Sequence, residues 1–583
     1  MTAPISALLR RIFRKNMNSK IISAESALIA SIVDSIVISK CLGLDAMGSY
    51  GLAMPVVFIA NALGKLISDG ATRQCGLSIG HGDAKDSRRI FSTGVLCSVL
   101  LSLALTILFL AVPESLAVLL GADGSAGGYL AGTAAYLRGY AWGIPAYVLL
   151  LAMIPFVQLE GKMAIVSAAG YSMAAADIVF DLLNAYVFHG GLWGMAFATS
   201  LSEIIGLGVL LIGFLRGSEF RFSFADVRLR MLLPLLRDGS PGFFSQFFTS
   251  VRSAAVNNAI VAYLPIEILP LFSGISSLMN VLYPVGKGIG NTAMLLASVF
   301  YGEEDSDSLW KVLRLAVRAS VIMNLALTVV VELFAPLLLR LFLTVTDAEL
   351  ALAAAGLRVI VLSLIPCSVQ TAYRNYVQGI GRIVQTTVII AVYECVISVF
   401  SVSLLAEYFS VGGFWVSFIA KEVLALVFDL VMVLVLNRIG RGAHSLRTAI
   451  LQIRDNFGIA EEDSLTASLF TEADAAAFAD SAEALLCDRA DVSCAPRLAG
   501  AIRERAVDVF GQEFPAREKP EILIRVYRRG TDWTVRFRDN GIRADGTETD
   551  YAADRAFRIR SLRQNVLVLC FSHAGADQAS VTE

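Results

Sequence analysis

Twelve long apolar runs dominate this sequence and limit the folds that it can adopt. A helix needs roughly 20 apolar residues to cross about 30 Å of hydrocarbon, and each run is about that long or longer. The runs lie at about residues 21–40, 47–68, 90–112, 132–157, 163–189, 192–215, 238–262, 270–300, 312–344, 352–378, 384–409 and 411–436. Because 56% of the residues are hydrophobic and only 17% are charged, we predict an all-α polytopic membrane protein with twelve transmembrane helices.

Basic residues in alternate loops predict the orientation of this bundle. They gather before the first run and in every second loop, as at Arg10, Lys15, Arg88, Arg221, Arg318 and Arg441. Cytoplasmic loops of membrane proteins have such an excess of Lys and Arg. We therefore expect a multi-pass protein of the cell's inner (plasma) membrane with both termini in the cytoplasm.

The apolar part of the chain contains an internal repeat. Gly82 and Gly302 are 220 positions apart, Pro145 and Pro366 are 221 apart, and Gly194 and Gly413 are 219 apart. A repeat that keeps its register indicates two duplicated six-helix bundles. We expect a cytosolic segment at 1–20, an N-lobe with helices 1–6 at 21–215, a cytosolic linker at 216–237, a C-lobe with helices 7–12 at 238–438, and a small cytosolic α/β domain, here called the tail, at 439–583.

Three carboxylates interrupt the apolar runs of the N-lobe. Asp34 lies in the first run, and Asp177 and Asp181 lie in the fifth. An ionised carboxylate in hydrocarbon costs several kcal/mol, so such residues mark ion or substrate paths more often than packing. Positions 177 and 181 are one helical turn apart and share a face. Capping of a kinked helix, or pairing with Lys40 or Lys65, is the alternative.

The sequence around these aspartates is similar to a known family. VDSIVISKCLGLDAMGSYGLAMPV resembles the first helix and following loop of the multidrug and toxic-compound extrusion (MATE) family, a member of a larger flippase superfamily. SIGHGDAKDSRRIFSTG resembles the loop between helices two and three of that family, and ADIVFDLLNAYVFHGGLWGMAFATSLSE resembles its Asn-x-x-x-Asp segment in helix five. The resemblance covers about residues 10–440.

This resemblance implies a cation site and an export function. The site would include Asp34, Asp181 and Thr199, with Asp177 where the family often has asparagine. Neighbouring carboxylates resist joint ionisation, which favours H⁺ over Na⁺ as the coupling ion. Thr199 has an alternative role, because helical threonines commonly bond to their own backbone. The expected activity is secondary active, cation-coupled antiport of small amphipathic organic compounds by alternating access of the two lobes.

The C-lobe has no copy of Asp34 but has its own intramembrane charges. They are Arg252, Lys287, Glu394, Lys421 and Glu422. Cations beside acids would bind an anionic or zwitterionic substrate, or would form an internal set of salt bridges between helices. Buried charges are usually paired, which favours the second interpretation.

The tail changes to a charged composition and contains strands. EILIRVYRRGTDWTVRFRDNG predicts a β-hairpin. The tail also resembles the GHKL-type ATP-binding fold of anti-sigma-factor kinases, which would assign nucleotide contacts to Glu504, Asp508, Asp539 and Gly541. It departs from that fold at Asp508, where asparagine is usual, and it lacks a glycine-rich second box. We expect a regulatory tail that docks a cytosolic protein, with ATP binding as the alternative.

Other classes of function are kept open or excluded by the motifs. The alternatives to an exporter are a lipid-linked oligosaccharide flippase of the same superfamily and a membrane sensor that controls its tail. The chain has no Gly-x-x-x-x-Gly-Lys-Ser/Thr phosphate loop. Its four histidines offer no metal cluster or nucleophile triad, so no enzymatic activity is expected. We expect a monomer in the lipid bilayer that needs no cofactor besides H⁺ or Na⁺ and binds no nucleic acid.

Overall fold

A computed structural model describes most of residues 7–571. The residues that it does not describe within this range are 43, 82, 120–128, 216–217, 219, 266–267, 341–345, 437–444, 454–456, 458–463, 490–492, 512–519, 530–531, 540–552, 554 and 562–563.

The N-terminal half of the bundle consists of helices joined by short turns where it is described. Its elements are α1 (Ala7–Val37), η1 (Ile38–Leu42), α2 (Leu44–His81), α3 (Ala84–Ala111), α4 (Pro113–Leu119), α5 (Tyr129–Tyr140), α6 (Ile144–Leu159), α7 (Met163–Leu183), η2 (Asn184–Phe188) and α8 (Gly191–Leu215). The turns η1 and η2 are π-helical.

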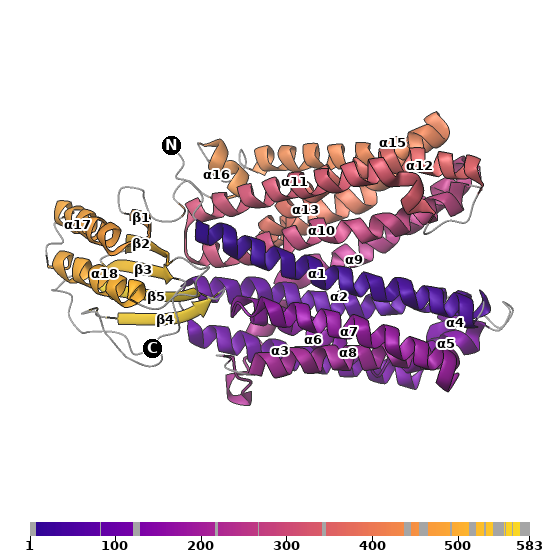
Figure 1. Ribbon diagram of the computed structural model, residues 1–583, viewed down its shortest axis with the longest axis horizontal. Helices are drawn as coiled ribbons and strands as arrows, with labels where there is room; N and C mark the ends of the chain where they lie inside the picture. Colours follow the sequence, from indigo (N-terminus) through magenta and orange to yellow (C-terminus); the bar gives the residue numbers. More distant parts are fainter. Residues whose placement is uncertain are drawn as a thin grey trace.

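The C-terminal half of the bundle has corresponding elements. They are η3 (Phe224–Asp226), α9 (Leu229–Tyr263), α10 (Ile268–Gly302), α11 (Ser306–Leu339), α12 (Asp347–Val361), α13 (Leu364–Gly379), α14 (Ile383–Ala391), η4 (Val392–Ile397) and α15 (Ser398–Leu436). In Figure 1 the two halves lie one above the other, with α1 along the boundary between them. Helix α1 packs against α7 of the N-lobe and also against α10 of the C-lobe.

The length and apolarity of the helices agree with a membrane-spanning bundle. Among the described residues, seven helical segments are long and apolar enough to cross a membrane. The count rises to eight when α5 and α6, which are bent by 51° relative to each other, are taken as one span. The number of twelve spans stays a prediction.

Backbone geometry repeats between the two halves with the period seen in the sequence. Gly161 and Gly381 both have positive φ, at +74° and +85°, and are 220 positions apart. His189 and Ser410, at +50° and +51°, are 221 positions apart. Non-glycine residues adopt positive φ rarely, and the two residues mark breaks at corresponding places, His189 after η2 and Ser410 at a kink within α15.

Two helices begin earlier than the apolar runs suggest. Helix α1 starts at Ala7 within the segment expected to precede the first span, because Leu9, Ile12, Phe13 and Met17 recur at helical spacing and are buried. Helix α9 starts at Leu229 inside the expected linker. The arginines of segment 216–237 are instead typical of a cytosolic loop.

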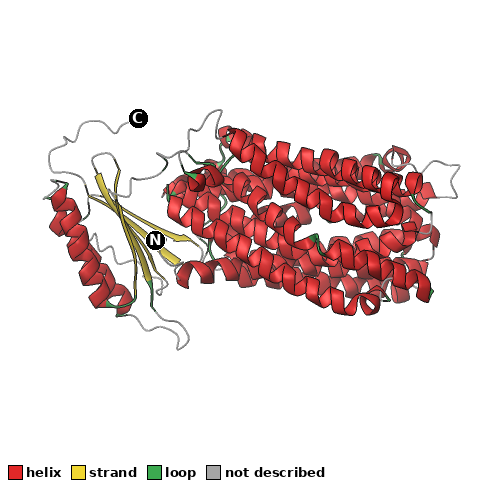
Figure 2. Ribbon diagram, turned by 90° about the horizontal axis from the view of Figure 1, so that it is seen from above, coloured by secondary structure: helices red, strands yellow, loops and turns green. Residues whose placement is uncertain are grey.

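The tail contains one antiparallel sheet. Its elements are β1 (Ser464–Leu469), α17 (Glu472–Asp488), α18 (Ala495–Phe510), β2 (Ile522–Arg529), β3 (Asp532–Asp539), β4 (Arg555–Ser561) and β5 (Gln564–Phe571), with strand order β1-β2-β3-β5-β4. The expected hairpin is present as β2 paired with β3. Figure 2 shows the sheet between the two helices and the membrane bundle.

The two faces of the sheet have different chemistry because side chains alternate along each strand. Trp533, Val535 and Phe537 are fully buried in the core formed with α17 and α18. The intervening Arg536 and Arg538 pair with Glu303, which directly follows α10. The short helix α16 (Leu446–Leu451) also packs against the bundle, since Tyr376 donates to the Leu451 carbonyl oxygen over 3.0 Å.

Candidate functional site

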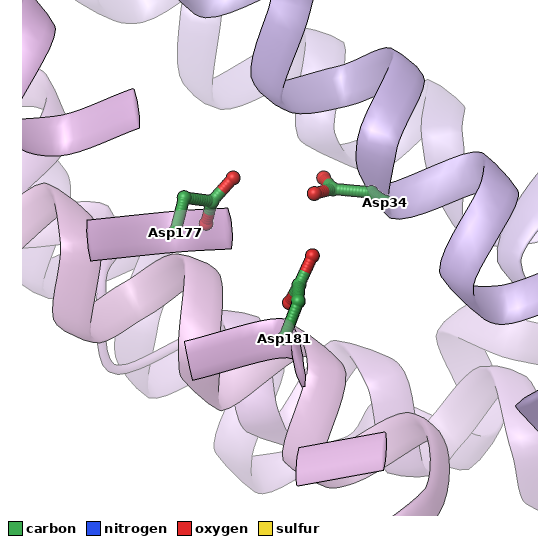
Figure 3. Close-up of side chains that lie close together, drawn as sticks. All are labelled: Asp34, Asp177 and Asp181. Carbon is green, nitrogen blue, oxygen red and sulfur yellow. The ribbon is translucent and has the colours of Figure 1, made fainter. Parts of the chain in front are cut away.

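The three intramembrane aspartates of the N-lobe lie together in the folded chain. Asp34 comes from α1, and Asp177 and Asp181 come from successive turns of α7. Figure 3 shows the three carboxyl groups directed toward one central point. Each offers one oxygen that lies within 4.8 Å of the corresponding oxygens of the other two. The fold therefore joins two residues of one helix face with a residue more than 140 positions away.

Helices α7 and α8 hold the second and third carboxylates in place. They form an antiparallel pair joined by η2, where Asn184 closes the turn by accepting from the Gly190 amide over 3.0 Å. The Ser202 hydroxyl of α8 donates to Asp177 Oδ1 over 3.0 Å. This contact fixes the orientation of the Asp177 carboxyl group toward the site.

The three carboxyl groups are buried and short of protein partners. Asp34, Asp177 and Asp181 are 8%, 3% and 0% exposed. Asp34 Oδ1 and both oxygens of Asp181 have no hydrogen-bond partner among the residues that the structure describes. Buried polar oxygens are rarely left unsatisfied, and these oxygens are able to take up a proton or to ligate a cation.

The donor set suits hard cations as well as protons. Carboxylate and hydroxyl oxygens are the ligands that hard metal ions prefer. The three aspartates and the Ser202 hydroxyl are the described groups that would hold such an ion.

Thr199 lies beside the cluster, since its side chain interacts with Asp177. Its hydroxyl donates to the Met195 carbonyl oxygen over 3.4 Å, which is the backbone bond common for helical threonines. A ligand role for Thr199 stays a prediction.

Ser202 and Glu203 are polar residues of α8 that the sequence analysis missed. Glu203 is 4% exposed, and its Oε2 atom has no hydrogen-bond partner in the described part of the chain. Its side chain approaches Gly143, where a Cβ atom would collide with it. Glu203 can be recognised in the sequence as a candidate site residue, since it is an acid inside the sixth apolar run.

The C-lobe charges form two ion pairs and leave one cation apart. Arg252 Nε lies 3.1 Å from Glu394 Oε2, and Lys421 Nζ lies 3.1 Å from Glu422 Oε1. Lys287 has no ion pair with any residue that the structure describes, although it lines the same cavity as Arg252 and Glu394. The Arg252–Glu394 pair joins α9 to η4, as the salt-bridge interpretation expects, whereas Lys421 and Glu422 are neighbours within α15.

The candidate nucleotide residues of the tail lie in different environments. Asp539 is fully buried, and one of its oxygens lies 2.6 Å from the Arg505 guanidinium of α18. Glu504 and Asp508 are exposed on the other side of that helix, and Gly541 lies outside the described residues. ATP binding stays a prediction.

Comparison with known protein families covers the membrane bundle. A family model described as MatE matches residues 22–183 and 241–403, which together make up more than half of the chain. The two matched segments fall in the two halves of the internal repeat.

Two curated relatives have names that refer to drug export. "Probable multidrug resistance protein NorM" of Bradyrhizobium diazoefficiens is 28% identical over 419 residues, covering 67% of this chain and 86% of the relative. "Multidrug export protein MepA" of Staphylococcus saprophyticus subsp. saprophyticus is 21% identical over 220 residues, covering 37% of this chain and 48% of the relative. The match with MepA thus spans about half the length of that relative.

Solved structures share the fold of the bundle. A structure described as "Outward-facing conformation of a multidrug resistance MATE family transporter of the MOP superfamily" superposes with a TM-score of 0.69 at 19% identity. The superposition covers 73% of this chain and 95% of the solved chain. At this identity the match shows the fold of the bundle alone.

Proposed function

Because this chain belongs to the MATE family of membrane transporters, we propose that it is a secondary active exporter of small amphipathic organic compounds, driven by a cation gradient. Members of this family are transporters, not enzymes. The names of the NorM and MepA relatives refer to multidrug resistance and export, which supports export as the direction of transport. Family membership favours the exporter over the flippase and sensor alternatives.

The observation that best supports cation coupling is the cluster of three buried aspartates. Carboxylates within 4.8 Å of one another in buried surroundings cannot all remain charged without a compensating cation or proton. Filling the site changes the charge that the surrounding helices must accommodate. The occupant therefore has different affinities for the two transport states, which is the condition for coupling.

Charge balance favours the proton as the coupling ion. A single Na⁺ bound to three ionised aspartates would leave a net charge of −2 in a buried site. At least two protons would still be needed for neutrality, whereas protons alone would neutralise all three carboxylates. Protonation is therefore required in either case, while sodium is not.

Contacts between the lobes support alternating access. Near the tail, the fully buried Asp238 of α9 accepts from Arg73 and Gln74 of α2. Asp69 of α2, which pairs with Lys65 over 3.2 Å, also lies 3.5 Å from the Gln378 amide nitrogen of α13. These contacts would close the cytoplasmic side in an outward-facing state and would have to break for the inward-facing state.

The cellular setting follows from the same arrangement. We propose a monomer in the inner (plasma) membrane, with both termini and the tail in the cytoplasm. Its partners would be the organic substrate, the bilayer and a cytosolic protein bound by the regulatory tail. No cofactor besides H⁺ or Na⁺ is required by this mechanism.

The test is gradient-driven uptake into inside-out vesicles with an acidic lumen. Two tritiated probes with the same aromatic group are used: the anion 2-naphthylacetate and the cation 2-naphthylmethyl-trimethylammonium. Passive partition of the weak acid opposes its accumulation in an acidic lumen, so uptake of the anion requires the transporter. A sodium gradient in place of the pH gradient separates the two coupling ions.

Uptake of at least one probe is expected in the native protein and is expected to be lost in Asp181→Asn. Asp86→Asn is the matched control, because it replaces a carboxylate that is 40% exposed and pairs with Arg89 outside the site. Equal uptake by native protein and Asp181→Asn would reject the coupling role. No gradient-dependent uptake of either probe would reject the exporter.

A further inference from the structure

The C-lobe contains two adjoining cavities that differ in chemistry. The larger has a volume of about 150 Å³ and the smaller about 120 Å³. They share a wall made by Arg252, Asn280 and Tyr283. A single elongated ligand could therefore occupy both.

Basic side chains outnumber acids around the larger cavity. Arg252, Lys287 and Arg374 line it together with one carboxylate, that of Glu394. Glu394 is engaged by Arg252 over 3.1 Å and by the Thr249 hydroxyl over 3.3 Å. Within the described ranges, neither Lys287 nor Arg374 forms an ion pair.

The surrounding acids do not remove this excess of positive charge. Glu422 is paired with Lys421 and also accepts from the Tyr393 hydroxyl over 2.6 Å. Buried Asp429 attracts Arg374 electrostatically but is not within ion-pair distance of it. Even with the charge of Asp429 counted, the larger cavity keeps at least one uncompensated cation.

The larger cavity also has a neutral donor ready for a ligand. The Ser368 hydroxyl lines this cavity, and Ser368 is only 3% exposed. Its oxygen has no hydrogen-bond partner among the described residues. A hydroxyl beside two cations is a donor set typical of carboxylate recognition.

Seven of the thirteen residues that line the smaller cavity are apolar, and the others include the uncharged Ser276, Asn280 and Ser398. Its apolar lining residues are Val256, Phe272, Ile275, Met279, Ile360, Val402 and Phe418. Its basic residues are Arg252 in the shared wall and Lys421, which is already paired with Glu422. This cavity offers contacts to an aromatic or aliphatic group rather than to a second charge.

We propose that the C-lobe binds an amphipathic organic anion, with its carboxylate between Lys287 and Arg374 and its apolar group in the cavity lined by Phe272 and Phe418. This inference rests on the proposed function as an exporter and assigns the charge of its substrate. A purely structural network would pair each cation, as Lys421 and Glu422 do. Lys287 is exposed and Arg374 is half-buried, so both can reach a ligand in the cavity, and a bound anion would compensate their charge.

Equilibrium binding to the full-length protein in nanodiscs tests this assignment. Tritiated 2-naphthylacetate and 2-naphthylmethyl-trimethylammonium are compared, since they differ in charge but share the naphthyl group. Native protein is expected to bind the anion in preference to the cation. Lys287→Gln and Arg374→Gln are each expected to weaken anion binding about tenfold or more, because each removes a charge-assisted hydrogen bond.

Two further variants separate lost charge from lost structure. Lys287→Glu is expected to reverse the preference toward the cationic probe, which a misfolded protein would not do. Lys85→Gln removes an exposed charge outside the cavities and is expected to bind the anion as the native protein does. Each variant is checked for a native elution volume in size-exclusion chromatography.

Several results would overturn the assignment. They are no saturable binding of the anion to native protein, equal binding of the two probes, or unchanged anion binding in Lys287→Gln and Arg374→Gln. Because binding needs no ion gradient, its outcome is independent of the uptake test. Anion binding without gradient-driven uptake would reject the exporter and keep the anion site, and cation uptake without anion binding would do the reverse.

Discussion

Replacing Glu303 by glutamine is expected to release the tail from the C-lobe. Glu303 is 6% exposed and lies between two arginines of β3. Its Oε2 atom is 3.3 Å from Arg536, and its Oε1 atom pairs with Arg538. The Arg525 side chain of β2 donates to the Glu303 backbone carbonyl over 3.2 Å, a contact that the substitution leaves in place.

The structure sets the size of this effect. Opposite charges 3.3 Å apart attract by about 5 kcal/mol at an effective dielectric constant of about 20, before desolvation is subtracted. Removing one partner of a buried pair typically costs about 3–5 kcal/mol, because the remaining charge stays buried. Asp305 lies 3.9 Å from Arg525 and compensates part of the charge, so we expect about 3 kcal/mol. The docking equilibrium should then fall on the order of 100-fold.

Energy transfer between two fluorophores reports the separation of the tail from the C-lobe. The fluorophores are attached to unnatural amino acids at the exposed positions Ala477 of α17 and Lys85 of α3, in full-length protein in nanodiscs. Urea is added until the tail separates, and the midpoints of native protein and Glu303→Gln are compared. A midpoint shift corresponding to about 3 kcal/mol is expected.

Asp480→Asn is the control for this measurement. Like Glu303→Gln, it converts a carboxylate to an amide, but Asp480 forms an exposed pair with Arg503 on the far side of the tail. Exposed pairs contribute at most about 1 kcal/mol, so little shift is expected. If Glu303→Gln shifts the midpoint no more than this control does, the buried cluster does not hold the tail to the C-lobe.

Two further predictions concern the end of the bundle that faces the tail. Asp238→Asn leaves the Arg73 guanidinium, whose side chain is only 12% exposed, without this partner. The change should loosen the inter-lobe closure and speed alkylation of the buried Cys75 about tenfold or more. An unchanged alkylation rate would reject the closure. Burial raises the pKa of Asp305, but attraction to Arg525 and its hydrogen bonds bring that pKa below the ordinary 3.8. The contribution of Asp305 to tail docking is therefore complete above pH 3.8 and is lost as the pH falls through its lowered pKa. Urea midpoints measured from pH 3 to 6 should show an acid-dependent loss that is smaller in Asp305→Asn than in native protein, and equal losses would contradict it.

Residues that depend on local spacing were predictable from the sequence. The position of Asp177 and Asp181 on the same face of α7 follows from the helical period alone. The hairpin of β2 and β3 follows from two alternating apolar segments around a glycine turn. Glu203 shows the limit of this reasoning, because an acid inside an apolar run was visible but its proximity to Gly143 was not.

The sequence by itself determined that this chain is a duplicated helical membrane bundle with acids in its N-lobe, because apolar length, repeat spacing and helical period are local or periodic properties. Only the tertiary structure decided which charges are compensated. Lys287 and Lys421 look equivalent in the sequence, yet only Lys421 has an ion pair among the described residues. Glu303 finds its arginines more than 230 positions away. Such contacts depend on how whole helices and strands pack, and no local pattern specifies that packing.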